Sequence, residues 1–347
     1  MEELEERLVS EGRGDLFRWL QRLRGTLLAG RWRVLDPIGV GGQGAVYRAV
    51  NEDDHEQVMV KLAALPYHQP SRFGRADVRV ARARMRREGE RLTRFVSCGL
   101  PMLREIVVAA NPLHEATRCA EITDEEVYVV MESVEGEPVD RAALHHWGPA
   151  PLEAARFPAI AGDKMFVDPR GFEVLPRMLG QQLAGVVSLS RVSTPGNVDV
   201  RTPSPALEKF LADVIRRVAL FEQACEDLGS VYTDIKPAHF VIGSDGPLLL
   251  RVLDAGALFE PGVDEAPATS HPYTPKLVEG SPVRALAQGA LARMIWQLWT
   301  GVAPRAEAFL ALERLDSGCA PPWLVALVKT LELGTEASWK DLIATAR

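Results

Sequence analysis

A glycine-rich segment and the lysine that follows it are the first residues whose spacing suits phosphate chemistry. Residues 38–46 read Ile-Gly-Val-Gly-Gly-Gln-Gly-Ala-Val, and Lys61 follows Gly44 by 17 positions. Glycines let backbone amides approach phosphate oxygens without a Cβ clash, and a lysine on a neighbouring strand can face the same oxygens. Glu88, in an arginine-rich stretch, could hold the Lys61 ammonium in place. A plain hairpin turn and a solvated Glu88 are the alternatives.

A second set of residues that suit phosphate chemistry lies between positions 231 and 256. Residues 231–242 read Val-Tyr-Thr-Asp-Ile-Lys-Pro-Ala-His-Phe-Val-Ile, and residues 253–256 read Leu-Asp-Ala-Gly. Here the chain resembles the protein kinase superfamily, and the Asp-x-Lys-Pro form resembles its serine/threonine branch. Asp234 and Lys236 match the aspartate and lysine of the kinase catalytic loop. Asp254 opens a triplet that stands where kinases have their metal-binding Asp-Phe-Gly.

The resemblance implies a role in phosphoryl transfer for each matching residue. Lys61 would hold the α- and β-phosphates of ATP, and Glu88 would orient Lys61. Asp234 would accept or orient the proton of the substrate hydroxyl, and Lys236 would offset charge on the γ-phosphoryl group. Asp254 would bind the divalent metal, Mg²⁺ or Mn²⁺. The residues expected to contact ATP are the glycine segment, the lysine and a hinge that meets adenine: Gly39, Val40, Gly41, Gly42, Gln43, Gly44, Val46, Lys61, Met131, Glu132 and Val134.

Three departures from the kinase pattern lie close to the expected chemistry. His239 stands where kinases carry a metal-binding asparagine, and imidazole suits softer ions than Mg²⁺. His239 is therefore expected either to retune a metal site or to serve as a structural residue of its loop; some bacterial lipopolysaccharide kinases resemble this chain in having histidine and phenylalanine here. Tyr232 and Thr233 replace the family's His-Arg, which removes the arginine that receives an activation-loop phosphate. Ala255 replaces the phenylalanine of Asp-Phe-Gly.

Two further departures concern the segment after the metal-binding triplet. Thr274, Pro275 and Lys276 replace the Ala-Pro-Glu that closes the kinase activation segment, and Arg284 stands where the large lobe usually has a buried aspartate. These residues belong to the peptide-docking surface in kinases, so a protein substrate is not assured.

The hydrophobic patterning predicts an α+β fold, and the resemblance implies a bilobal kinase-like one. A small antiparallel β-sheet lobe with one main helix would precede a larger, mainly helical lobe. Strands are predicted at 32–38, 45–50, 58–62, 103–110 and 127–131, and helices at 76–96, 207–229, 283–300 and 321–333. The predicted domains are a helical extension at 1–30, the small lobe at 31–131, and the large lobe at 132–347 with an irregular insertion at about 141–205.

Composition excludes several classes of protein. The 347 residues are 47% hydrophobic and 25% charged with net charge −7, which excludes intrinsic disorder and gives no sign of nucleic-acid binding through charge. The four cysteines form no CxxC pair, so neither a zinc site nor a secreted disulfide framework is expected. The acidic N-terminus and the lack of a long uncharged apolar window predict no signal peptide and no membrane span. A cytoplasmic location is expected.

The sequence thus predicts an ATP-dependent phosphotransferase, first of all a serine/threonine protein kinase with an unidentified protein substrate. One alternative is a pseudokinase, a scaffold that binds nucleotide or partners without catalysis. Another is a kinase for a small-molecule or glycolipid acceptor. The acceptor, the oligomeric state and the role of residues 141–205 are left open by the sequence.

Overall fold

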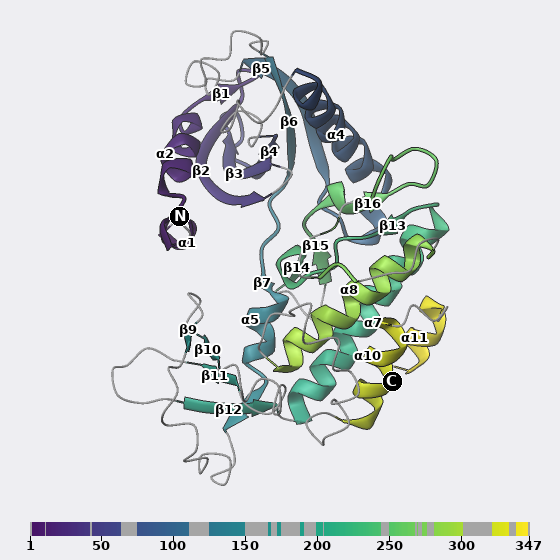
Figure 1. Cartoon of the computed structure of the whole chain (residues 1–347). Coiled ribbons are helices and arrows are strands. Elements are labelled where there is room, and N and C mark those ends of the chain that lie inside the picture. The colour runs from purple at the N-terminus through teal and green to yellow at the C-terminus, as the bar shows by residue number, and fades with distance from the viewer. Residues whose placement is uncertain are drawn as a thin grey trace. The chain divides into compact units, whose positions relative to one another are not determined.

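The computed structural model of the chain forms two compact units (Figure 1). Unit 1 contains Met1–Val134 and Val252–Gly256, and unit 2 contains Glu135–Arg251 and Ala257–Arg347. The structure describes residues 2–10, 12–41, 44–63, 75–110, 125–149, 166–167, 172–174, 188–190, 199–203, 205–243, 250–267, 269, 273–275, 281–300, 321–332 and 338–345.

Unit 1 is built on a six-stranded antiparallel sheet in the order β1-β2-β3-β4-β6-β5. The strands are β1 (Leu27–Leu28), β2 (Trp32–Gly41), β3 (Gly44–Asn51), β4 (Gln57–Leu62), β5 (Leu103–Ala110) and β6 (Glu125–Glu132). All five predicted strands are present, and β1 adds a short edge strand. Strands β4 and β6 are interior and buried along most of their length, which explains why their sequences are nearly continuous apolar runs.

One long helix, α4 (Arg75–Arg94), packs against β5 and β6 of this sheet. Met85 and Leu92 bury their side chains at helical spacing. Gly89 allows the close approach, because a Cβ at this position would lie 2.7 Å from the Cδ1 atom of Ile106 on β5. The helix is therefore held near the sheet at the residue that follows Glu88.

The N-terminal segment belongs to the core of unit 1. It contains α1 (Glu2–Ser10), α2 (Gly14–Leu20) and the 3-10 turn η1 (Gln21–Leu23). Its buried side chains join those of the sheet in one hydrophobic cluster that includes Leu4, Leu8, Leu16, Phe17, Trp19, Leu20, Leu23, Trp32, Val34 and Tyr47. The buried Tyr47 hydroxyl also donates a hydrogen bond to the Leu20 carbonyl oxygen at 3.0 Å. Segment and sheet therefore share one apolar core.

The helical pattern predicted for residues 1–30 fails at its end. Gly25 adopts a left-handed backbone conformation with φ of 82°. Its amide donates a hydrogen bond to the Val34 carbonyl oxygen on β2 at 2.8 Å, so the chain leaves the helical path here. Leu27 consequently lies in strand β1, opposite Arg33, and is 41% exposed instead of covering a helix face. Strand pairing thus overrides the 3.6-residue period here.

Unit 2 is mainly helical. Its helices are α5 (Val139–Leu144), α7 (Pro205–Asp227), α8 (Val283–Thr300), α10 (Pro322–Glu332) and α11 (Trp339–Thr345). Helix α7 packs on α8 and α11, and α10 packs on α8 (Figure 1). Short strands accompany these helices. β13 (Val231–Tyr232) pairs with β16 (Leu258–Phe259), and β14 (Phe240–Ile242) lies between β15 (Leu250–Val252) and β7 (Glu137–Pro138), which precedes α5. The predicted α+β class is therefore correct.

The stretch at 141–205 contains more regular structure than its sequence indicates. Its described parts form a five-stranded antiparallel sheet in the order β8-β12-β11-β10-β9. The strands are β8 (Trp147–Pro149), β9 (Phe166–Val167), β10 (Phe172–Val174), β11 (Ser188–Ser190) and β12 (Asp199–Pro203). Strands this short carry too few residues to show a two-residue period, so the prediction of irregular structure was wrong for these parts.

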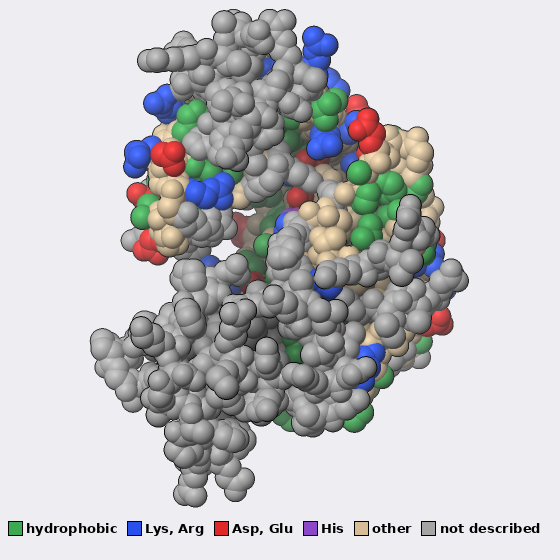
Figure 2. All heavy atoms as spheres, viewed as in Figure 1, with side chains coloured by type: hydrophobic (Ala, Val, Ile, Leu, Met, Phe, Trp, Pro, Cys, Tyr) green, Lys and Arg blue, Asp and Glu red, His purple; other side chains and the backbone are tan. Residues whose placement is uncertain are grey.

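The surface of unit 1 carries charges of both signs close together (Figure 2). Arg33 pairs with Glu52, and Arg104 pairs with Glu56. Within the described residues, none of the helices combines the length and the apolar character needed to cross a bilayer.

Candidate functional site

Three of the predicted site residues meet inside unit 1. Lys61 lies on β4, Glu88 on α4, and Asp254 in the short segment that returns to unit 1. The Lys61 Nζ atom lies 2.7 Å from Glu88 Oε1 and 2.7 Å from Asp254 Oδ1. Only 7% of the Lys61 side chain and 3% of the Glu88 side chain are exposed, against 17% for Asp254. A solvated Glu88, the alternative to pairing, is excluded.

Burial and pairing act in opposite directions on the charges of this cluster. Burial by itself would lower the pKa of Lys61, but the carboxylates of Asp254 and Glu88 outweigh it and raise the pKa above its usual value. Burial raises the pKa of Glu88 to about 7, although the Lys61 ammonium opposes this change. Lys61 is thus a permanent cation, and Glu88 is the member whose charge changes near neutral pH.

The local fold explains why these side chains converge. Lys61 is paired with Val46 on β3 and Val129 on β6, so its backbone is fixed between two strands. Gly44 permits the chain to pass close to the end of β4, because a Cβ there would lie 2.1 Å from the Leu62 carbonyl oxygen. Asp254 is oriented in turn by the Gly256 amide, which donates to its Oδ1 atom at 3.0 Å.

The glycine segment forms the end of the β2–β3 hairpin. Gly39 pairs with Val46, Val40 with Ala45, and Gly41 with Gly44. Gly42 and Gln43 lie outside the described residues. Gly44 therefore lies on β3, the strand next to Lys61, whereas Gly39 and Gly41 lie on β2, one strand further away.

The predicted hinge begins at the end of β6, which contains Met131 and Glu132, and Val134 follows the strand. Met131 is buried, and Glu132 and Val134 are half-buried. The Glu132 amide donates to the Met102 carbonyl at 2.8 Å, and the Met102 amide donates to a Glu132 carboxylate oxygen at 3.0 Å. This double contact anchors the start of the hinge to the residue before β5.

The second group of predicted site residues meets inside unit 2. Asp234 and Lys236 follow β13, and Lys236 Nζ lies 2.8 Å from Asp234 Oδ2. Thr233 holds the loop in place, because its amide and its hydroxyl both donate to the Ala257 carbonyl, at 3.0 and 3.2 Å. Thr233 therefore has a structural role in this loop.

His239 lies at the far end of the same loop, in the 3-10 turn η7 (Pro237–His239). Its Nδ1 atom lies 2.9 Å from the Tyr232 hydroxyl oxygen and 3.7 Å from Asp234 Oδ2. Only 12% of the His239 side chain is exposed. The structural alternative predicted for His239, a hydrogen bond to its own loop, is thus observed.

A buried acid that the sequence analysis did not single out lies under this loop. Glu222 on α7 is fully buried, and its Oε2 atom accepts a hydrogen bond from the Tyr232 amide at 3.2 Å. Burial raises the pKa of Glu222 well above its usual value, although the hydrogen bond from the Tyr232 amide opposes this change. The only sequence signal was a glutamate in the middle of the apolar stretch of α7.

The other residues that differ from the kinase pattern lie in different parts of the structure. Ala255 is fully buried, and Lys276 lies outside the described residues. The Thr274 carbonyl accepts a hydrogen bond from Arg293 on α8 at 2.8 Å. Arg284, at the start of α8, forms a two-pronged ion pair with Glu226 at the end of α7.

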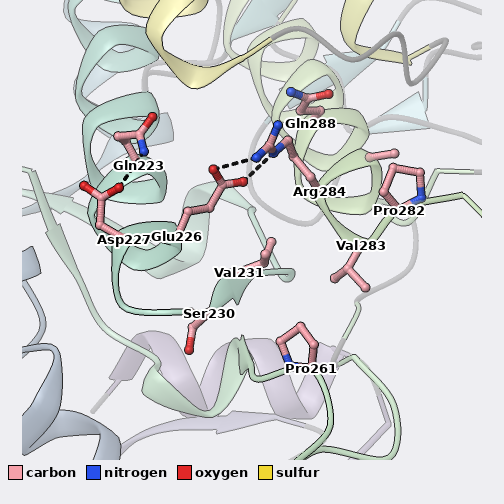
Figure 3. Close-up of a pocket in the computed structure, with 12 residues that line it drawn as sticks. Gln223, Glu226, Asp227, Ser230, Val231, Pro261, Pro282, Val283, Arg284 and Gln288 are labelled. Atoms are coloured by element: carbon pink, nitrogen blue, oxygen red, sulfur yellow. Dashed lines mark hydrogen bonds and ion pairs between the residues drawn. The ribbon is translucent and has the colours of Figure 1, made fainter.

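The Arg284–Glu226 pair stands in the wall of a pocket of about 670 Å³ (Figure 3). The pocket lies between the end of α7, β13 and the start of α8, and none of its lining residues is a predicted site residue. Glu226 also accepts a hydrogen bond from the Trp339 indole on α11 at 3.1 Å. Arg284, which stands where kinases usually have a buried aspartate, therefore joins the start of α8 to the end of α7.

The donor set fits a divalent cation that arrives with phosphate groups. Among the described residues, no three His, Cys, Asp or Glu side chains converge as a protein-only metal cage would need. Asp254 offers carboxylate oxygens, and Mg²⁺ is commonly held by one or two carboxylates with phosphate oxygens and water as its other ligands. The adjacent His145 and His146 have different neighbours, Glu137 and Phe210, and so do not form a metal pair.

Comparison with known proteins assigns no family to the chain. No protein-family model matches it, and no curated protein sequence matches it. The functional conclusion therefore depends on the residues and their contacts.

Proposed function

We propose that the chain is an ATP-dependent phosphotransferase of the protein kinase type. The observation that carries the proposal is the buried cluster of Lys61, Glu88 and Asp254. These residues lie far apart in the sequence, and the Lys61 ammonium donates directly to both carboxylates. A buried lysine between two carboxylates is expensive to desolvate, so its presence favours a functional role over a purely structural one.

In unit 1, the proposed reaction uses Lys61 to bind the α- and β-phosphates of ATP. Glu88 keeps the ammonium in position through its 2.7 Å contact. Asp254 would hold a divalent cation, Mg²⁺ or Mn²⁺, which when bound neutralises charge on the β- and γ-phosphates. Because Lys61 and Asp254 bond to each other in the free chain, phosphate oxygens would compete with Asp254 for the ammonium when ATP binds.

In unit 2, the proposed reaction uses Asp234 to orient the acceptor hydroxyl and take its proton. The hydroxyl oxygen forms a bond to the γ-phosphorus while the bond between that phosphorus and the β,γ-bridging oxygen breaks, and ADP leaves. Lys236 offsets the charge that develops on the transferred group. Thr233 anchors this loop to Ala257 without an arginine, so we expect transfer without prior phosphorylation of the chain.

Intact-mass spectrometry of the full chain, incubated with ATP and either Mg²⁺ or Mn²⁺, tests the proposal. A mixed-peptide substrate and a hydroxyl-bearing glycolipid are supplied as acceptors in parallel reactions. We expect phosphate on the chain or on one acceptor, and at least a hundredfold loss of transfer in Asp234→Asn. The matched control is Asp227→Asn, an exposed carboxylate on α7 of the same unit.

The acceptor that gains phosphate identifies the branch of the proposal. Phosphate on the chain or the peptide supports a protein kinase, and phosphate on the glycolipid alone supports the glycolipid alternative. Binding of ATP without transfer to any acceptor would support the scaffold alternative. Equal transfer by the wild type and Asp234→Asn would overturn the proposed chemistry.

A further inference from the structure

We propose that Glu222 is a positioning residue that fixes the backbone just before Asp234, an inference that rests on the function proposed above. Glu222 lies on α7 and is fully buried. Its Oε2 atom accepts a hydrogen bond from the Tyr232 amide at 3.2 Å, two residues before Asp234. All three residues belong to unit 2. Glu222 takes no part in the proposed transfer itself and acts through the backbone of the loop.

Strand β13, which leads into Asp234, has a strand neighbour on one side. Within the part of the chain that the structure describes, β13 pairs only with β16, and the Thr233 amide continues this pairing by donating to the Ala257 carbonyl. Residues of an antiparallel pair alternate between those that bond to the partner strand and those that do not. The Tyr232 amide therefore points away from β16, and Glu222 on α7 supplies its acceptor. The carboxyl group thus takes the place of a second neighbour strand.

The Tyr232 amide lies where water cannot replace this acceptor. Tyr232 is fully buried, and its ring makes edge contacts with Phe221 on α7 and Phe240 on β14, at centroid distances of 5.3 and 5.9 Å. A buried backbone amide without an acceptor is unfavourable, because it has lost its hydrogen bond to water. Without Glu222, the loop would therefore shift to conformations in which this amide reaches another acceptor.

Two anchors on opposite sides of the chain precede Asp234. Glu222 holds Tyr232 from α7, and the Ala257 carbonyl accepts from both the amide and the hydroxyl of Thr233, at 3.0 and 3.2 Å. The Asp234 carboxylate, which is 6% exposed, follows directly. Because catalysis is sensitive to displacements on the order of 1 Å, release of one anchor should slow transfer without weakening the binding of ATP by Lys61.

The carboxyl group of Glu222 is present at a cost to stability. Its Oε1 atom is buried and has no hydrogen-bond partner among the described residues. An unpaired polar atom in an apolar surrounding is unfavourable, and natural proteins tolerate such conflicts mainly at functional sites. The unpaired oxygen therefore favours a role in positioning the loop over a role in stability alone.

The rate of phosphate transfer from radiolabelled ATP to the mixed-peptide substrate, the glycolipid or the chain itself tests the inference. Glu222→Met fills a similar volume without an oxygen, and Glu222→Gln keeps an oxygen acceptor without the acid. We expect Glu222→Met to lower the maximal rate at least about tenfold, with the KM for ATP changed less than about twofold. Glu222→Gln should restore most of the rate.

Controls separate this effect from a loss of stability. Rates are compared per folded molecule, with the folded fraction measured by near-UV circular dichroism. Glu208→Met is the matched control, because Glu208 is another α7 glutamate with a hydrogen bond, from the Trp323 indole on α10, and it should leave the maximal rate unchanged. In an Asp234→Asn background, Glu222→Met should cause no further loss, because the residue that it positions no longer acts.

The outcomes separate this inference from the proposed function. Transfer by the wild type with an equal maximal rate in Glu222→Met would overturn the role of Glu222 and leave the phosphotransferase proposal standing. An equal loss in Glu222→Gln and Glu222→Met would also overturn it, because glutamine keeps the acceptor. Absence of transfer by the wild type to all three acceptors would overturn both proposals.

A shorter acid covers the case in which Glu222→Met does not fold. Glu222→Asp keeps the carboxyl group but draws its oxygens back from the Tyr232 amide by one methylene. We expect a loss of maximal rate of about tenfold in this variant, again with little change in the KM for ATP. An unchanged maximal rate in Glu222→Asp would refute the inference.

Discussion

Lys61→Met tests whether the buried ammonium group stabilises the two carboxylates that surround it in unit 1. The side chain of Lys61 is 7% exposed, and both Glu88 and Asp254 bond to its Nζ atom. Methionine fills a similar volume without charge, so the change removes the cation and leaves little empty space. Removing one partner of a buried ion pair costs about 3 to 5 kcal/mol, because the remaining charge is uncompensated.

The pH dependence of this cost follows from Glu88. Its folded pKa, about 7, lies above the ordinary 4.5, so the stability associated with the protonated form is present below pH 4.5 and is lost as pH rises to 7. Without Lys61, the pKa of Glu88 in the folded state rises further. The variant therefore continues to lose folding stability as pH rises above 7, whereas in the wild type this loss of stability has ended. Because one pH unit corresponds to about 1.4 kcal/mol, the difference between the two proteins should grow by roughly 3 kcal/mol from pH 7 to 9.

Urea denaturation followed by tryptophan fluorescence at pH 6, 7, 8 and 9 measures this difference. Lys61→Met together with Glu88→Gln should remove most of the growth with pH, because the carboxylate that titrates is gone. Lys209→Met, an exposed lysine on α7, is the control and should behave as the wild type at every pH. A cost of Lys61→Met that is the same at pH 6 and pH 9 would refute the reasoning.

Three further changes test other parts of the fold. Glu222→Gln should stabilise the chain increasingly as pH rises above 4.5, because the raised pKa of Glu222 makes the wild type lose stability as pH rises, while glutamine does not titrate. Thermal melts at pH 5 and pH 8 measure the stability that the variant gains over the wild type, and an equal gain at both pH values would contradict this. Leu20→Ala should cost about 3 kcal/mol in urea denaturation, and Leu27→Ala, at an exposed strand position, less than 1 kcal/mol; equal costs would argue against the shared N-terminal core. Gly89→Ala should cost about 1 to 3 kcal/mol by pushing α4 from the sheet, and Ile106→Ala in the same chain should recover part of it; a neutral Gly89→Ala would show that the helix adapts freely.

The sequence by itself determined the elements and the chemistry-bearing residues of unit 1. Alternating polar and apolar residues, and short apolar runs, predicted its strands. Each strand has at least one buried face, and successive side chains point to opposite faces, so burial of one face gives a period of two residues. Helical spacing located α4, α7, α8 and α10 for the corresponding reason. Lys61 and Glu88 were predicted from their residue types and their spacing after the glycine segment, and Asp254 from the resemblance of its triplet to the kinase Asp-Phe-Gly.

Only the tertiary structure decided which of these residues meet. Lys61 and Asp254 are far apart in the chain, and their contact depends on a return of the backbone to unit 1 that no local pattern encodes. The short strands within 147–203 form through backbone hydrogen bonds between neighbours, which leave no period in so few residues. The Tyr232–His239 contact likewise depends on the path of the loop between them, so two residues that look like independent substitutions in the sequence become one hydrogen-bonded pair in the fold.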